Sequence, residues 1–218
     1  MNSRRTLVLG TAVLTLAGFG GATYHFTLRQ WPPPVAALPG DSPLIRQHSP
    51  ILGDADAPVT IVEFFDPACE ACRAFHPIVK QIINAFPSRV RVVLRYAAFH
   101  PPSQEAIVIL ETARLQNLFQ PVLEALFESQ PLWASHGRQS VSAWPIAARA
   151  GLDVERAQRE RLLPHILATL NQDAADVATI GVRQTPTFFV NGRPLQEFGA
   201  QQLYNLVRSE VAATAQRR

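Results

Sequence analysis

Both cysteines of this 218-residue chain lie in one short segment, residues 64–72, which reads FFDPACEAC. Two thiols three positions apart can bind a metal, form a structural disulfide or exchange electrons with another dithiol. A disulfide across so short a loop hardly constrains the unfolded chain, and the six scattered histidines with no second cysteine motif supply no zinc site. Copper would want more soft ligands than the one methionine, and haem attachment needs a histidine where Arg73 stands. We therefore expect Cys69 and Cys72 to form a redox-active pair that needs no metal and no other cofactor.

The residues on either side of the pair predict a strand, a helix and a second strand. Residues 58–65 are a β-branched and aromatic run, which is typical of a strand buried on both faces. Apolar residues recur at helical spacing in residues 73–85, and residues 89–96 form a second strand-like run. This order predicts a parallel βαβ unit.

The cysteines should lie at the start of that helix. At a helix N-terminus, unpaired N–H groups and the helix dipole favour the thiolate of Cys69 and lower its pKa. Cys72 would lie one turn deeper on the same face, where it is sheltered. Thiol–disulfide exchange needs this combination of an accessible attacking thiol and a resolving thiol.

A helical block is predicted after the second strand, and a β-hairpin after that block. The expected helices are residues 103–117 with Ser103 as N-cap, 121–128, 141–150 ending at Gly151, a helix from its cap Asp153 towards residue 170 that is interrupted near Pro164, and 173–180. Asn191-Gly192 between residues 185–190 and 193–195 predicts the hairpin, and residues 201–213 predict a closing helix.

The first thirty residues predict an export segment. Residues 1–5 carry two arginines, and residues 7–22 are apolar and uncharged. The uncharged stretch continues to Leu28, which is long enough to span a bilayer of about 30 Å. We expect a signal-anchor over residues 1–30, with a cleaved signal peptide as the alternative. The pair Arg4-Arg5 leaves twin-arginine export open beside the general route.

Between this segment and the domain lies a proline-rich stretch. Residues 31–50 contain six prolines, which predict a stiff linker before a domain that covers residues 51–218. The positive charges are scattered, and Lys80 is the only lysine. No basic stripe of the kind that binds nucleic acid is present.

The Cys-x-x-Cys segment, the helical block and the pair Thr185-Pro186 before a hairpin resemble the DsbA-like thiol:disulfide oxidoreductases. The resemblance covers about residue 53 to the C-terminus. It implies a thioredoxin-like α/β fold, in which helices flank a central mixed sheet and an α-helical insertion covers about residues 103–180.

The resemblance also implies roles for individual residues. Cys69 matches the nucleophile and Cys72 the resolving thiol of the family. Pro186 matches a proline with a cis bond beside the active site. Thr185 matches the residue whose backbone pairs with bound substrate.

Other matches leave alternatives open. Glu63 matches a buried acid that assists proton transfer, and burial would raise its pKa, but an edge position reaching solvent is the alternative. Pro77 matches a proline that kinks the active-site helix, or else it marks a helix end. His76 could favour a thiolate if protonated, or could be a packing histidine, and His100 has the same two interpretations.

The dipeptide Glu70-Ala71 between the cysteines should tune the redox potential. The strongly oxidising members of the family carry a histidine there. An ionised Glu70 would oppose an adjacent thiolate, while the helix dipole favours it by about 0.3–1 kcal/mol. We expect a less oxidising disulfide than that of the strongest members.

These observations predict a protein thiol:disulfide oxidoreductase that acts on exported proteins, with a disulfide-forming oxidase as the first hypothesis. Outside the cytoplasm an unprotected pair drifts towards the disulfide. The alternatives are a reductase or isomerase for particular clients, and a non-redox chaperone of the same fold. The resemblance implies a membrane redox partner, either a DsbB-like oxidase or a DsbD-like reductant. The expected location is the periplasmic side of the cytoplasmic membrane, or the free periplasm after cleavage.

Overall fold

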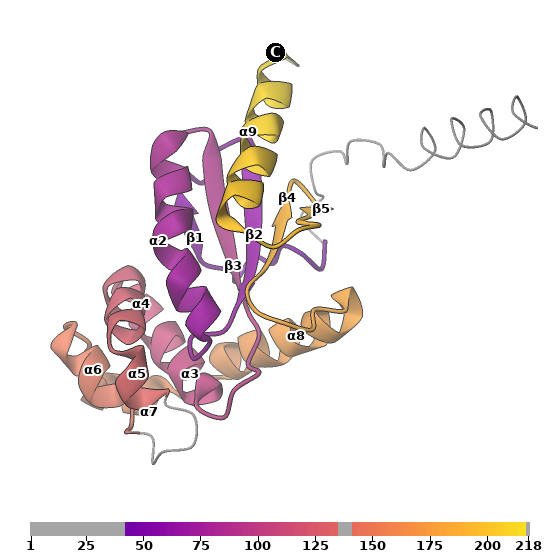
Figure 1. Cartoon of the computed structure of the whole chain (residues 1–218). Helices are drawn as coiled ribbons and strands as arrows, with labels where there is room; N and C mark the ends of the chain where they lie inside the picture. Colours follow the sequence, from indigo (N-terminus) through magenta and orange to yellow (C-terminus); the bar gives the residue numbers. More distant parts are fainter. Residues whose placement is uncertain (1–41, 135–140, 217–218) are drawn as a thin grey trace, which may run out of the picture. The chain divides into compact units, whose positions relative to one another are not determined.

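A five-stranded mixed sheet forms the centre of the domain in the computed structural model, which describes residues 42–134 and 141–216. The strand order is β1-β3-β2-β4-β5, so β2 is central (Figure 1). β2 pairs with β3 in parallel and with β4 antiparallel, and β1 and β5 are antiparallel edge strands. The strands are β1 (Ile51–Gly53), β2 (Val59–Phe65), β3 (Val90–Tyr96), β4 (Thr187–Val190) and β5 (Arg193–Pro194). The predicted parallel βαβ unit and the hairpin are confirmed, whereas β1 was not predicted.

Each face of the sheet has its own apolar cluster, because successive residues of a strand point to opposite faces. Ile61 and Phe65 of β2 belong to the cluster that α2 (Glu70–Ala85) and α9 (Ala200–Gln216) cover. Val62 and Phe64 belong to the second cluster, which includes residues of α8 (Pro164–Ile180). All seven residues of β2 are buried, as its apolar sequence predicted.

Among the described residues, six helices lie between β3 and β4 and form the predicted insertion, which gathers around the N-terminal end of α2 (Figure 1). They are α3 (Ser103–Arg114), α4 (Phe119–Glu128), α5 (Gln130–Trp133), α6 (Trp144–Arg149), α7 (Val154–Glu160) and α8. Asp153 caps α7 as predicted, because its side chain accepts a hydrogen bond from the Arg156 amide at 2.9 Å.

Two predictions about the insertion are wrong in detail. Pro102, not Ser103, is the N-cap of α3, and the Ser103 hydroxyl instead donates to Asp66. Residues 173–180 are not a separate helix but the end of α8, which begins at Pro164. Proline disfavours helical geometry in the residue before it, so the chain breaks at Leu163 and a new helix starts.

The domain begins upstream of the predicted boundary at residue 51. Leu44 and Ile45 pack against the second apolar cluster. The Arg46 guanidinium donates to both carboxylate oxygens of Asp176 in α8, at 2.7 and 2.8 Å. Residues 42–50 of the predicted linker are therefore part of the domain.

The predicted export segment and the first part of the linker lie outside the described residues. Among the described residues, no helix has the length and apolar character that crossing a membrane requires.

Candidate active site

The redox pair occupies the start of α2, as predicted. Cys69 is the N-cap of the helix, with φ −81° and ψ 124°, and Cys72 lies in its first turn. Cys69 is 8% exposed and Cys72 is completely buried. Both are free thiols in this structure. Only the first cysteine can therefore meet a client directly.

The pKa values of the two thiols are shifted in opposite directions. Hydrogen bonding from the Cys72 side chain is the largest cause that lowers the pKa of Cys69. Hydrogen bonds from Thr185 and from the backbone of Ala71 and Cys72 add to it. Together they outweigh the effect of burial and bring this pKa to about 5. Burial raises the pKa of Cys72 far above its usual range, and its hydrogen bond to Cys69 adds to this effect. At neutral pH the reduced pair therefore holds a thiolate on Cys69 and a thiol on Cys72.

We expect the ultraviolet absorbance of the Cys69 thiolate to appear with a midpoint near pH 5 in the reduced protein. The low pKa of this thiol predicts a rate of reaction with a disulfide reagent that stays nearly constant above about pH 6. Titration at 240 nm measures the thiolate, and Cys69→Ser supplies the blank. A midpoint near pH 9, the value of an unperturbed thiol, would contradict the assignment.

Glu63 lies in the middle of the sheet. Its strand pairs with β3 on one side and β4 on the other, and the residue is 5% exposed. The alternative of an edge position reaching solvent is therefore wrong. Burial raises the pKa of this carboxyl to about 8. When Glu63 is ionised, its negative charge raises the pKa of the Cys72 thiol.

The loop before β4 contacts the redox pair at Cys69. The Thr185–Pro186 bond is cis, as the resemblance implied. The Cys69 thiol lies 3.2 Å from the carbonyl oxygen of Thr185. Residues 116 positions apart in the chain therefore meet at the reactive sulfur.

Two further residues hold the loop before Cys69, and the sequence analysis missed both. Asp66 is fully buried, and its backbone amide donates to the Cys72 sulfur at 3.4 Å. The side-chain amide of Gln130 donates to the carbonyl oxygens of Pro67 and Cys69 at 2.8 and 3.0 Å. An aspartate among apolar residues three positions before Cys69 was a signal that could have pointed to Asp66, whereas nothing local marks Gln130.

The other predicted residues lie on α2 or against the loop before Cys69. Pro77 lies inside α2, which continues through it, so the alternative of a helix end is wrong. The pKa of His76 is lowered, chiefly by burial, which disfavours the cationic form that would help a thiolate. His100 does contact the loop, because its Nδ1 lies 2.7 Å from an oxygen of Asp66. Glu70 is exposed as the first residue of α2, and Ala71 packs against the core.

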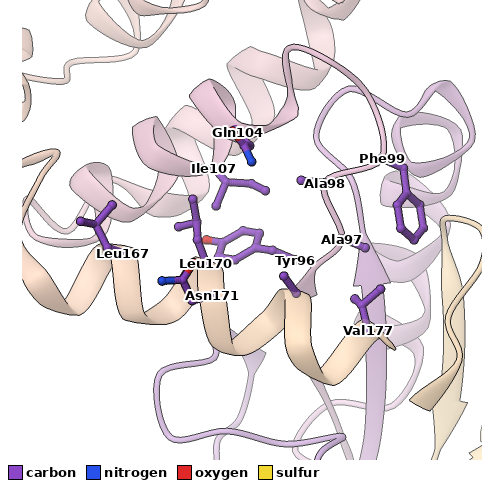
Figure 2. Close-up of a pocket in the computed structure, with 11 residues that line it drawn as sticks. Tyr96, Ala97, Ala98, Phe99, Gln104, Ile107, Leu167, Leu170, Asn171 and Val177 are labelled. Carbon is purple, nitrogen blue, oxygen red and sulfur yellow. The ribbon is translucent and has the colours of Figure 1, made fainter. Parts of the chain in front are cut away.

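A pocket of about 430 Å³ lies next to this loop, between α3, α8 and the residues that follow β3 (Figure 2). Its lining is mainly apolar, and Figure 2 shows Tyr96, Ile107 and Leu170 gathered at one side of it. The Tyr96 hydroxyl donates to Glu111 at 2.7 Å, so it is already paired. Phe99 lines the pocket, and its backbone amide donates to Asp66 at 2.8 Å. The pocket is thus linked to the active-site loop, but neither cysteine lines it.

A dithiol at a helix N-terminus, facing a cis-proline loop on this mixed sheet, defines the thiol–disulfide oxidoreductases of the thioredoxin fold. Residues 46–207 match the family model described as Thioredoxin, and the chain belongs to that family. The expected resemblance to the DsbA-like proteins is confirmed at the level of the fold.

Solved structures of similar fold cover most of the chain. A thioredoxin-like oxidoreductase from Silicibacter pomeroyi DSS-3 is 27% identical, with a TM-score of 0.64 over 79% of this chain and 95% of that one. BdbD from Bacillus subtilis is 24% identical, with a TM-score of 0.67 over 75% and 93% of the two chains. Wolbachia pipientis α-DsbA1 is 17% identical, with a TM-score of 0.69 over 80% and 96%. The last two likenesses show the fold.

Curated relatives of similar sequence are much longer proteins. The Na(+)/H(+) antiporter NhaA of Herminiimonas arsenicoxydans is 30% identical over 179 residues, which are 81% of this chain and 28% of that protein. The chain spans less than a third of the length of this and the next such relatives. The similarity therefore concerns one part of those proteins.

Proposed function

We propose that this protein is a disulfide-forming thiol oxidase for exported proteins. The observation that carries the proposal is the place of the accessible Cys69 sulfur at the N-terminus of α2, above the buried Cys72, where hydrogen bonding lowers its pKa to about 5. A disulfide is a strong oxidant when its reduced form is stabilised. A reduced pair that holds one stable thiolate therefore favours transfer of the disulfide to a client.

The reaction follows from the accessibility of the two sulfurs. A client thiolate attacks Cys69 in the Cys69–Cys72 disulfide, the bond between the two cysteines breaks, and Cys72 leaves and takes up a proton. A second client thiolate then attacks the client sulfur of the mixed disulfide, and Cys69 leaves as a thiolate. The client loses two electrons and gains a disulfide, and the enzyme pair is reduced without any other cofactor. The low pKa of Cys69 makes it the better leaving group in the second step.

Glu63 is the proposed proton donor to Cys72. Its pKa of about 8 keeps it protonated at neutral pH, when the buried Cys72 leaves as a thiolate. A charged sulfur at this fully buried position is costly, so proton transfer from a nearby acid favours opening of the disulfide. Thr185 would pair its backbone with the bound client at the Cys69 sulfur.

The proposed setting rests on the sequence of residues 1–30, which predicts export and anchoring. Clients would be exported proteins with free thiols. A membrane oxidase of the DsbB-like kind would remove electrons from the reduced pair, whereas a DsbD-like reductant would serve the opposite direction.

Glu70 favours a second candidate, a reductase or isomerase for particular clients, because its carboxylate lies beside Cys69 in the chain. The pKa of Cys69 is low even though Glu70 is its neighbour in the chain, and this supports the oxidase instead. We still expect a potential below that of the strongest oxidant of this kind, which is about −120 mV. Equilibration with glutathione measures it, and Glu70→Gln is expected to raise it modestly. A wild-type value near −120 mV would contradict the tuning role of Glu70.

The direction of transfer is tested with a reduced client protein that has two cysteines. The oxidised full-length protein should form the client disulfide, with one pair of enzyme thiols appearing for each disulfide formed. Faster repair of a scrambled client than oxidation of a reduced one would favour the isomerase. Binding of an unfolded client with no thiol change would favour the chaperone.

A further inference from the structure

The short segment between β2 and α2 is held in place by side chains of the helical insertion. The side-chain amide of Gln130 in α5 donates to the carbonyl oxygens of Pro67 and Cys69, at 2.8 and 3.0 Å. The Cys69 carbonyl also accepts the first helical hydrogen bond of α2, from the Arg73 amide at 3.1 Å. Gln130 therefore holds the residue that carries the reactive sulfur at the point where the helix begins.

Both bonds of Gln130 fix the orientation of its side chain. Carbonyl oxygens only accept, so the nitrogen must face Pro67 and Cys69. The remaining oxygen, Oε1, is then buried and has no hydrogen-bond partner among the described residues. Leaving a buried acceptor unpaired is unfavourable, so the side chain is not optimal for stability. Its two donated bonds to the active-site loop are what it supplies.

Asp66 also links this segment to the start of the insertion. Its Oδ1 accepts from the Ala68 amide at 2.8 Å and from the hydroxyl of Ser103, the first residue of α3. Its Oδ2 accepts from the amides of Phe99 and His100 at 2.8 and 3.2 Å, and lies 2.7 Å from the His100 ring. The start of the insertion and the active-site loop thus share one buried carboxylate.

The position of this segment decides how well the Cys69 thiolate is stabilised. The hydrogen bonds that lower its pKa come from the Cys72 thiol, from Thr185 and from the first turn of α2, and hydrogen bonds weaken steeply with distance and angle. Cys72 is itself held by the Asp66 amide. A small displacement of the loop would weaken several of these bonds together.

We propose that the helical insertion positions the segment that carries Cys69, through Gln130 and through its contacts with Asp66, and so sets the acidity and the redox potential of this thiol. Gln130 is then a positioning residue for the exchange reaction. This inference rests on exchange at Cys69 but not on its direction. The insertion is then part of the redox site.

The test replaces Gln130 with methionine, which has a similar size but no donor, in the full-length protein. We expect a rise of at least one unit in the Cys69 pKa, measured by thiolate absorbance. The equilibrium constant with glutathione should move about tenfold towards the enzyme disulfide, which corresponds to about 30 mV in the less oxidising direction. Ser103→Ala removes one donor to Asp66. It should change the acid dissociation constant of Cys69 and the equilibrium constant with glutathione in the same directions, each by about threefold.

Gln116→Met is the matched control, because Gln116 bridges two segments of the insertion through both backbone groups of Asp153, at 3.0 and 3.1 Å, and is only half-buried. It should leave the pKa and the equilibrium constant unchanged. Wild-type values in folded Gln130→Met, or an equal shift in Gln116→Met, would overturn the proposal. If Gln130→Met does not fold, wild-type values in Ser103→Ala overturn it. Failure of the wild-type protein itself to exchange with glutathione would overturn the proposed function as well.

Discussion

Cys69→Ser is expected to abolish thiol–disulfide exchange, with a fall of at least about 10³-fold in the rate of client oxidation. The reason is that Cys69 is the more accessible member of the pair, at 8% exposed, while Cys72 is completely buried and cannot meet a client. A serine hydroxyl cannot form the mixed disulfide. The measurement is the rate at which a reduced two-cysteine client acquires its disulfide. Oxidation by Cys69→Ser at a rate near that of the wild type would show that Cys69 is not the nucleophile.

Cys72→Ala is the matched variant for this experiment. It keeps the nucleophile but removes the resolving thiol, so mixed disulfides on Cys69 should accumulate and can be isolated with their clients. The Cys69 pKa should also rise in this variant, because hydrogen bonding from Cys72 is the largest cause of its low value. Absence of mixed disulfides in cells that export this variant would contradict the exchange mechanism. The trapped proteins would identify the clients and the recycling partner.

Glu63→Gln is expected to stabilise the protein at alkaline pH. The carboxyl has a pKa of about 8 in the folded protein and an ordinary value of 4.5, so between these values the folded state holds a proton that the unfolded state has released. Stability of the wild type should therefore fall as pH rises, by about 1.4 kcal/mol per unit, to a total of about 3–5 kcal/mol near pH 8. Glutamine does not titrate, and the variant should lack this slope.

Denaturant unfolding of the oxidised proteins at pH 5, 7 and 9 measures the effect without titration of the thiols. Glu124→Gln is the control, because Glu124 is exposed and pairs with Lys80 at the surface, where ion pairs contribute little. Equal pH dependence in the wild type and Glu63→Gln would contradict the raised pKa. Glu63→Gln should also slow disulfide opening if Glu63 gives its proton to Cys72, and an unchanged rate would contradict the relay.

Local patterns in the sequence were sufficient for the elements that carry the redox pair. The apolar run of β2, the helical spacing of α2 and the Asn191-Gly192 turn each act over a few residues, and all three are confirmed. The low pKa of Cys69, which its place at a helix N-terminus predicted, has a partly local cause in hydrogen bonds from Cys72 and the backbone of the first turn, to which the distant Thr185 adds. The resemblance to a known family added the cis bond at Pro186, which lies far along the chain from the cysteines.

Features that depend on long-range packing did not follow from the sequence. β1 is only three residues long, so its alternation is too short to predict, and its pairing with β3 makes it a strand. The packing of Leu44 and Ile45 and the ion pair of Arg46 with Asp176 depend on a helix about 130 residues away.

The sequence by itself therefore determined the type of fold, the redox pair and the loop that faces it. The tertiary structure alone decided which side chains hold that pair. Gln130 reaches the Cys69 carbonyl across 61 positions, and Ser103 reaches Asp66 across 37. Periodicity and capping report on neighbours within a few residues, whereas contacts of this kind exist only once the insertion has packed around the start of α2.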